Sequence, residues 1–169
     1  MPEARIDLID ALPVPYGLIR YGVAPDHQGT KAVIRQFERL FERQGVGFFG
    51  DVRLGETVTL EALQGLYDAV VLATGLSTDR RLGVKGDDLP GVLGSGAVTR
   101  ALNDYPDAEP VSIGERVVII GNGNVAVDLV RLLAKGAEEF HGSDLSDAAA
   151  RQCGKVRRID VVGRSPSDA

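Results

Sequence analysis

Residues 121–126 read Gly121-Asn122-Gly123-Asn124-Val125-Ala126, a match to the dinucleotide-binding pattern GxGxx(G/A). An apolar strand is expected before them at 116–120 and an amphipathic helix after them at 125–134, which is the setting that the pattern requires. Gly121 would permit a tight turn, Gly123 would let the backbone approach a pyrophosphate, and Ala126 would let helix and strand pack closely. The helix start would then offer amide hydrogens and a positive dipole end to the phosphates. We therefore expect a nucleotide site here rather than a glycine turn without a ligand.

The end of the next strand, expected at 156–162, indicates which nicotinamide cofactor this motif would bind. An acidic residue at this place suits a free ribose hydroxyl, whereas an arginine suits a phosphate. The chain carries Arg164 and Ser165 there, and a guanidinium beside a hydroxyl can hold a 2′-phosphate, so the sequence favours NADP over NAD. Asp144 lies about twenty residues after the motif, as a ribose-binding acid would, but its polar surroundings are more typical of a helix N-cap. Arg164 as a solvated surface charge stays the alternative.

The rest of the chain alternates strands with helices, which predicts an α/β fold built on Rossmann-like parallel sheets. Strands are expected at 6–10, at 47–51, at 69–73 and, briefly, within 90–94. Helices are expected at 30–44, where Gly45 supplies the stop, at 60–66 and at 97–103. The proline-bearing segments 12–17 and 105–114 are expected to be loops.

Composition and charge exclude several classes of partner. The net charge of −5 and the lack of a long basic block argue against nucleic acid and anionic membranes. No apolar run approaches the roughly 18 residues that span a bilayer, and the first residues do not resemble a signal peptide, so we expect a cytoplasmic protein without membrane insertion. Cys153 is the only cysteine, and neither His27 nor His141 has a second ligand at metal-binding spacing, so no metal site is expected. Redox chemistry would therefore need a bound cofactor.

Four motifs in a fixed order resemble a known family. Residues 14–27 read VPYGLIRYGVAPDH, 67–75 read YDAVVLATG, 89–92 read LPGV and 121–128 read GNGNVAVD. Together they resemble the adrenodoxin reductase family, which includes actinobacterial ferredoxin–NADP reductases, and they cover nearly the whole chain. The small subunits of glutamate synthase share the nucleotide motif but lack the ending of the first motif.

The resemblance implies an activity and a domain organisation. Members of the family have an FAD domain with an inserted NADP domain, and they transfer hydride from NADPH to FAD before passing single electrons to a ferredoxin-like iron–sulfur protein. We accordingly expect part of an FAD-binding domain over residues 1–77 and part of an NADP-binding domain over 78–169. The family's first FAD fingerprint would precede Met1, and further FAD contacts would follow Ala169, so the resemblance implies a fragment.

The resemblance also assigns roles to residues that would bind the two cofactors. Asp10 would hold the adenosine ribose of FAD, and Leu18 and Leu54 would contact FAD. The residues that would contact NADP are Arg80, Asn122, Gly123, Asn124, Val125 and, at the 2′-phosphate, Arg164 with Ser165. The family usually has two arginines where this chain has Arg164-Ser165, a departure that would weaken the preference for NADP.

Two further residues match positions near the junction of flavin and nicotinamide. There, His27 and Asp128 would assist proton movement or align the rings. Taken without the resemblance, His27 would be a loop histidine that makes local hydrogen bonds, and Asp10 would be a residue of a strand-ending turn.

Two functions of other classes stay open. The chain could be a pyridine-nucleotide-binding module without activity, or an interaction subunit that completes its site with another chain. Turnover of an artificial acceptor with NADPH would separate an enzyme from a binding module, and co-purification of a flavin-bearing partner would favour the interaction subunit.

Overall fold

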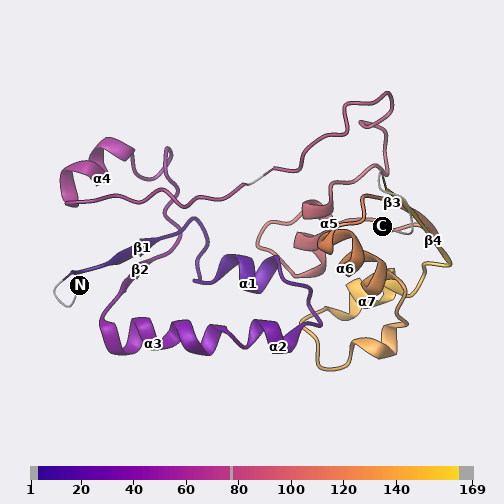
Figure 1. Ribbon diagram of the computed structural model, residues 1–169, viewed down its shortest axis with the longest axis horizontal. Coiled ribbons are helices and arrows are strands. Elements are labelled where there is room, and N and C mark those ends of the chain that lie inside the picture. The colour runs from indigo at the N-terminus through magenta and orange to yellow at the C-terminus, as the bar shows by residue number, and fades with distance from the viewer. Residues whose placement is uncertain (1–3, 77, 164–169) are drawn as a thin grey trace. The chain divides into compact units, whose positions relative to one another are not determined.

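The computed structural model describes residues 4–76 and 78–163 (Figure 1). The chain divides into two compact units, the first comprising Met1–Arg20 and Gly29–Ser77 and the second comprising Tyr21–Gln28 and Thr78–Ala169. The segment Tyr21–Gln28 thus belongs to the second unit, although the chain on both sides of it belongs to the first. The assignment of residues 1–77 to FAD and of 78–169 to NADP stays a prediction.

The first unit is built on two short parallel strands. These are β1 (Asp7–Ile9) and β2 (Gly47–Phe49), paired in register from their first residues to their last. The helices along this part of the chain are α1 (Gly17–Tyr21), α2 (Gln28–Lys31), α3 (Ile34–Gln44) and α4 (Leu60–Leu66). A turn at residues 32–33 splits the helix expected at 30–44. Gly45 ends α3 as expected, in the left-handed conformation with φ at 65°.

Aromatic side chains provide much of the packing in the first unit. The ring of Phe41 on α3 meets Tyr16 and Phe48 edge-on, with centroids 5.9 and 6.3 Å apart. Edge-to-face pairs of this kind add specific attraction to the burial of apolar area. They attach α3 to β2 and to the loop that precedes α1.

Two of the predicted strands are wrong. Residues 69–73 form no strand, and the side chain of Val71 is 85% exposed. Residues 92–94 also stay irregular after a turn in which Gly91 has φ at 87°. An apolar run becomes a strand only where a neighbouring strand supplies hydrogen bonds and its faces are covered, and among residues 4–76 and 78–163 neither segment pairs with such a neighbour.

The second unit contains the predicted strand–helix–strand arrangement. Strands β3 (Arg116–Ile120) and β4 (Arg158–Val162) pair in parallel along their full lengths. The connection between them carries α6 (Asn124–Leu133), the 3-10 helix η1 (Ala137–Phe140) and α7 (Asp147–Cys153), and α5 (Ser95–Leu102) precedes the sheet. Helix α6 packs against β3 and α5 (Figure 1).

Element η1 was not predicted, and the helix expected to start at Asp144 begins two residues later than that, as α7. Ser146 is the N-cap, because its Oγ accepts the amide hydrogen of Ala149 at 3.3 Å. The N-cap role expected of Asp144 is therefore wrong. The two elements follow a glycine-rich polar stretch whose periodicity is weak, so their helical form depends on packing Phe140, Ala150 and Cys153 into the core.

The core of the second unit lies between β3 and the helices. Its most buried side chains are those of Leu102, Leu132 and Cys153. Burial raises the pKa of the Cys153 thiol to about 11, which makes it a packing residue rather than a nucleophile. None of the helices in the described ranges is long and apolar enough to cross a membrane.

Candidate functional site

The turn between β3 and α6 needs its two glycines for different reasons. Gly121 has φ at 119°, a backbone conformation that side chains disfavour, and its amide donates to the Val162 carbonyl at 2.7 Å. Gly123 is the N-cap of α6 with φ at −79° and ψ at 179°, which any residue can adopt. A Cβ built on Gly123 would meet no atom within 4 Å. Gly121 is therefore required by the chain itself, whereas Gly123 leaves space that a ligand can use.

The start of α6 has amide groups available for an acceptor. Gly123 supplies no side-chain cap, and the first hydrogen bond of the helix runs from the Val127 amide to the Gly123 carbonyl at 3.0 Å. The amides of residues 124–126 precede that bond and lack helical partners. Such amides, together with the positive end of the helix dipole, bind phosphate groups.

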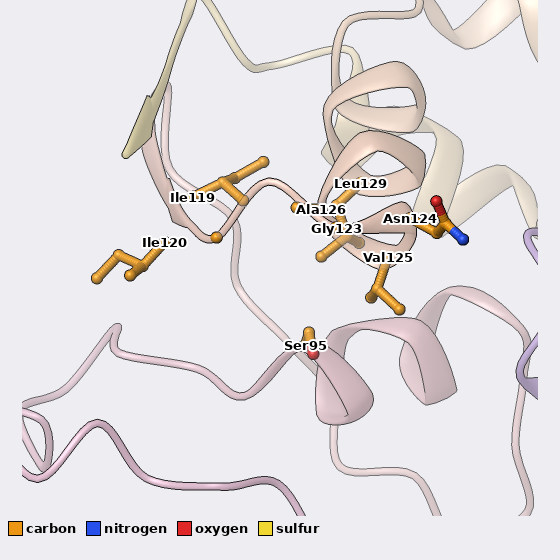
Figure 2. A pocket seen from close by; sticks show the side chains of 9 residues that line it. Ser95, Ile119, Ile120, Gly123, Asn124, Val125, Ala126 and Leu129 are labelled. Atoms are coloured by element: carbon orange, nitrogen blue, oxygen red, sulfur yellow. The ribbon is translucent and has the colours of Figure 1, made fainter. Parts of the chain in front are cut away.

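The first residues of α6 line a cavity of about 290 Å³ (Figure 2). It extends from the carboxyl end of β3 to the start of α5, and its lining is formed by Ser95, Ile119, Ile120, Gly121, Gly123, Asn124, Val125, Ala126 and Leu129. In Figure 2 Ser95 lies across from the first turn of α6, near Val125. The predicted residues Gly121, Gly123, Asn124 and Val125 are thus brought together in the lining of one cavity.

Asp79 belongs to this region although the sequence analysis did not single it out. Its carboxylate accepts the amide hydrogens of Gly96 at 2.8 Å and Ala97 at 3.1 Å, and thereby caps α5 next to the cavity residue Ser95. Arg80, predicted to contact NADP, is the next residue and is exposed. Asp79 therefore anchors the backbone beside Arg80 at the start of α5. Asp79 and Gly96 are 17 positions apart in the chain, so no local spacing could have indicated this cap.

His27 and Asp128 are neighbours in the second unit. The distance from His27 Nδ1 to Asp128 Oδ1 is 3.9 Å, and the two side chains are 42% and 35% exposed. Asp128 lies on α6, one turn beyond the amides at the start of that helix. Their proximity brings the loop residue His27 next to a carboxylate on the helix that follows the glycine motif, and their catalytic role stays a prediction.

A second missed residue, Asp26, lies beside this pair. Arg131 Nη1 and Lys135 Nζ both donate to Asp26 Oδ2, and the Asp26 side chain is only 9% exposed. Burial alone would raise the pKa of the Asp26 carboxyl, but the hydrogen bonds from Arg131 and Lys135 outweigh it and lower that pKa below the ordinary value. Arg131 Nη2 also donates to Asp128 Oδ1 at 3.1 Å. Asp26 is therefore an ionised, nearly buried carboxylate.

The residues expected to contact FAD belong to the first unit. Asp10 Oδ1 accepts the Leu12 amide hydrogen at 2.9 Å and so forms a strand-ending turn. Leu18, on α1, is 80% exposed, and Leu54 forms an isolated bridge with Val58. Contacts of these three residues with FAD stay predictions. Arg164 and Ser165, expected at the 2′-phosphate, lie outside the described residues.

Comparison with known proteins identifies relatives along nearly the whole chain. It is 50% identical to cindoxin reductase of Citrobacter braakii over an alignment of 170 residues. This alignment covers 99% of this chain and 37% of cindoxin reductase. The chain is 39% identical to NADPH-ferredoxin reductase FprA of Mycobacterium tuberculosis, with coverage of 96% and 37%. It is 37% identical to the mitochondrial NADPH:adrenodoxin oxidoreductase of Arabidopsis thaliana, with coverage of 95% and 35%. The chain thus spans about a third of the length of the curated relatives it matches.

A solved structure agrees with the sequence relatives. Mycobacterium tuberculosis FprA in complex with NADPH matches this chain with a TM-score of 0.87 at 37% identity, covering 95% of this chain and 36% of that one. This match confirms the predicted Rossmann-like α/β fold. The family model described as pyridine nucleotide-disulphide oxidoreductase matches residues 12–157. With most of its length matched by the model and its fold shared with a solved relative, the chain belongs to the pyridine nucleotide-disulphide oxidoreductase family.

Proposed function

We propose that the protein is an FAD-dependent ferredoxin–NADP reductase of the adrenodoxin reductase type. It would transfer hydride between NADPH and FAD and pass single electrons to a ferredoxin-like iron–sulfur protein. The observation that carries the proposal is the open glycine turn at the start of α6, where Gly123 leaves room beside uncapped amides. The names of the relatives, which include reductases of cindoxin, adrenodoxin and ferredoxin, support this choice of partner.

The second unit fits NADP. The amides of residues 124–126 would hold the pyrophosphate, and the apolar lining of the cavity would cover uncharged parts of the nucleotide. Arg80, held beside α5 by the Asp79 cap, would add a positive charge. Arg164 and Ser165 would hold the 2′-phosphate and so favour NADP over NAD.

The first unit offers a partial fit to FAD. Asp10 ends β1 with its carboxylate oriented by the Leu12 amide, as a ribose-binding acid requires, and the exposed side chain of Leu18 offers an apolar contact. FAD, when bound, supplies the chemistry that links a two-electron donor to a one-electron acceptor. His27 and Asp128 would then align the reacting rings or assist proton movement.

The proposal is tested by the visible absorption spectrum of the chain after addition of FAD and removal of free flavin. We expect a retained flavin band that NADPH bleaches and that an iron–sulfur acceptor restores. A retained band that NADPH leaves unchanged would contradict the proposed reaction. Loss of the band on desalting would mean that these residues are at most an NADP-binding piece and that the activity belongs to a longer protein. Flavin that appears only when a second protein co-purifies would favour the interaction subunit.

Removal of the Arg164 guanidinium tests the choice of NADP. We expect Arg164→Ala to weaken NADP binding about 10-fold to 100-fold, because a charged hydrogen bond contributes about 1.5–3 kcal/mol and each 1.4 kcal/mol is tenfold. NAD, which has no 2′-phosphate, should bind with unchanged affinity. Isothermal titration calorimetry with both nucleotides measures the difference. Arg157→Ala, which removes an exposed arginine from the same segment, is the control and should change neither affinity.

The cytoplasm is the location that we propose. The support is that Cys153, the single cysteine of the chain, is buried and free, as expected where thiols stay reduced. Cell fractionation with detection of the protein tests this location. Recovery with an organelle fraction, as the mitochondrial name of one relative would suggest, would contradict it.

A further inference from the structure

The segment that precedes His27 is fixed in the core of the second unit. The side chain of Ala24 is 3% exposed and that of Pro25 is fully buried. The Asp144 amide donates to the Pro25 carbonyl at 3.0 Å, and the His27 amide donates to the Ala24 carbonyl at 2.9 Å, which closes a tight turn. The backbone position of His27 is therefore fixed, but these contacts do not determine the orientation of its imidazole ring.

Asp26 adds an ionic attachment between this turn and α6. Its Oδ2 receives Arg131, from the last turn of α6, and Lys135, just beyond the end of that helix. Arg131 also binds Asp128 Oδ1, and Asp128 faces His27. Since His27 follows Asp26 in the chain, hydrogen bonds through Arg131 and one peptide bond connect Asp128 to His27, whose Nδ1 lies 3.9 Å from Asp128 Oδ1.

Only one of the two carboxylate oxygens of the nearly buried Asp26 has hydrogen-bond partners among the described residues. Its Oδ1 is buried and has no hydrogen-bond partner among the described residues. Ion pairs that are nearly buried are often no more stabilising than apolar side chains of the same size, but they fix one arrangement of the groups that they join. Here the arrangement that they fix is the approach of His27 to Asp128.

We propose that Asp26, with Arg131 and Lys135, is a positioning residue that holds His27 against Asp128 on α6. The inference rests on the proposed function, because His27 and Asp128 matter there as groups that serve the reacting rings. Asp26 is not among the residues that line the cavity and acts through His27.

The test begins with nuclear magnetic resonance, which needs no cofactor. The chain has two histidines, so the imidazole nitrogens give one signal set from His27 and one from His141, which is exposed and serves as a reference. In the full chain, Asp26→Asn should move the His27 resonances toward those of His141 and leave His141 unchanged. Asp160→Asn removes the same charge from the Arg158–Asp160 pair in the same unit and should move neither histidine. His27 resonances that do not respond to Asp26→Asn would overturn the proposal.

Two further variants protect the test from a simple loss of folding. Asp26→Glu keeps the charge and should retain part of the wild-type His27 shift. Lys135→Met leaves the bond from Arg131 to Asp26 in place and should move the His27 resonances in the same direction by a smaller amount. A His27 signal that responds to Asp26→Asn but stays at its wild-type position in Lys135→Met would contradict the joint role given to Lys135.

Flavin reduction by NADPH provides the second readout, in FAD-loaded protein. In Asp26→Asn we expect the limiting rate to fall about 10-fold, because misplacement of a group in the site is costly, while the half-saturating NADPH concentration changes by less than about twofold. Asp26→Asn combined with His27→Gln should be no slower than His27→Gln alone. Additive losses would show that Asp26 acts other than through His27. A wild-type protein that NADPH does not reduce would refute the proposed function, whereas the resonance test would still decide the role of Asp26.

Discussion

Gly123→Ser should weaken NADP binding about 100-fold and leave the protein as stable as before. The new side chain would fill the space beside the first turn of α6, where a Cβ meets no atom of the chain. Its hydroxyl would also cap the amides that a pyrophosphate needs, and the loss of two charge-assisted bonds of about 1.5 kcal/mol each corresponds to about 100-fold. Serine is a favoured N-cap, so the free energy of unfolding should stay constant or rise by about a few tenths of a kcal/mol. Calorimetric titration with NADP and urea denaturation measure the two effects.

The opposite response of binding and stability is what makes this variant informative. Gly114→Ser is the matched control, because a Cβ at Gly114 also meets no atom within 4 Å but lies in the loop before β3, outside the cavity lining. It should change neither quantity. Unchanged NADP affinity in Gly123→Ser would mean that the phosphates bind elsewhere. The open turn at the start of α6 would then no longer support the proposed function.

Gly121→Ala should lower the free energy of unfolding by about 2 kcal/mol, within the usual range of about 1–3 kcal/mol for a strained backbone conformation. Gly121 has φ at 119°, which a residue with a Cβ adopts only under strain. The Cβ itself would meet no atom, so the cost comes from the backbone and not from a clash. Relaxation of that strain would shift the amides of α6, and we expect NADP binding to weaken as well. Denaturation followed by circular dichroism measures the loss.

Gly114→Ala separates the backbone effect from the general effect of replacing glycine. Both substitutions place a Cβ in open space, but only Gly121 has a φ in the region that disfavours side chains. The control should change stability by less than about 0.5 kcal/mol. If Gly121→Ala were equally harmless, the turn could adopt another conformation, and the geometry of the start of α6 would not be fixed by this glycine.

Much of the second unit could be predicted because its signals are local. Strand β3 has the predicted bounds, and α6 is displaced by one residue, because an apolar run, a glycine turn and an amphipathic period follow one another directly. The same holds for α4, which starts at the Thr59 cap, and for the stop at Gly45. Each of these features is determined by residues within one or two turns of one another.

The failures concern residues whose partners are far away in the chain. The run at 69–73 is as apolar as a strand, but a strand forms only with a neighbour, and that neighbour is not read from the run itself. The pairing of Asp26 with Arg131 joins residues 105 positions apart. Neither residue type nor spacing distinguishes such an aspartate from an ordinary loop residue.

The sequence by itself determined the glycine motif and the strand and helix on its two sides, because a glycine pattern and a hydrophobic period are properties of adjacent residues. Only the tertiary structure decided that Gly121 serves the backbone while Gly123 leaves space, since φ and open volume depend on surrounding atoms. It also decided that Asp79 caps α5 and that Asp26 lies beside the His27–Asp128 pair. The physical reason is that burial and ion pairing depend on which distant segments pack together. The free-energy cost of burying a charged side chain is set by the partners that this packing brings to it.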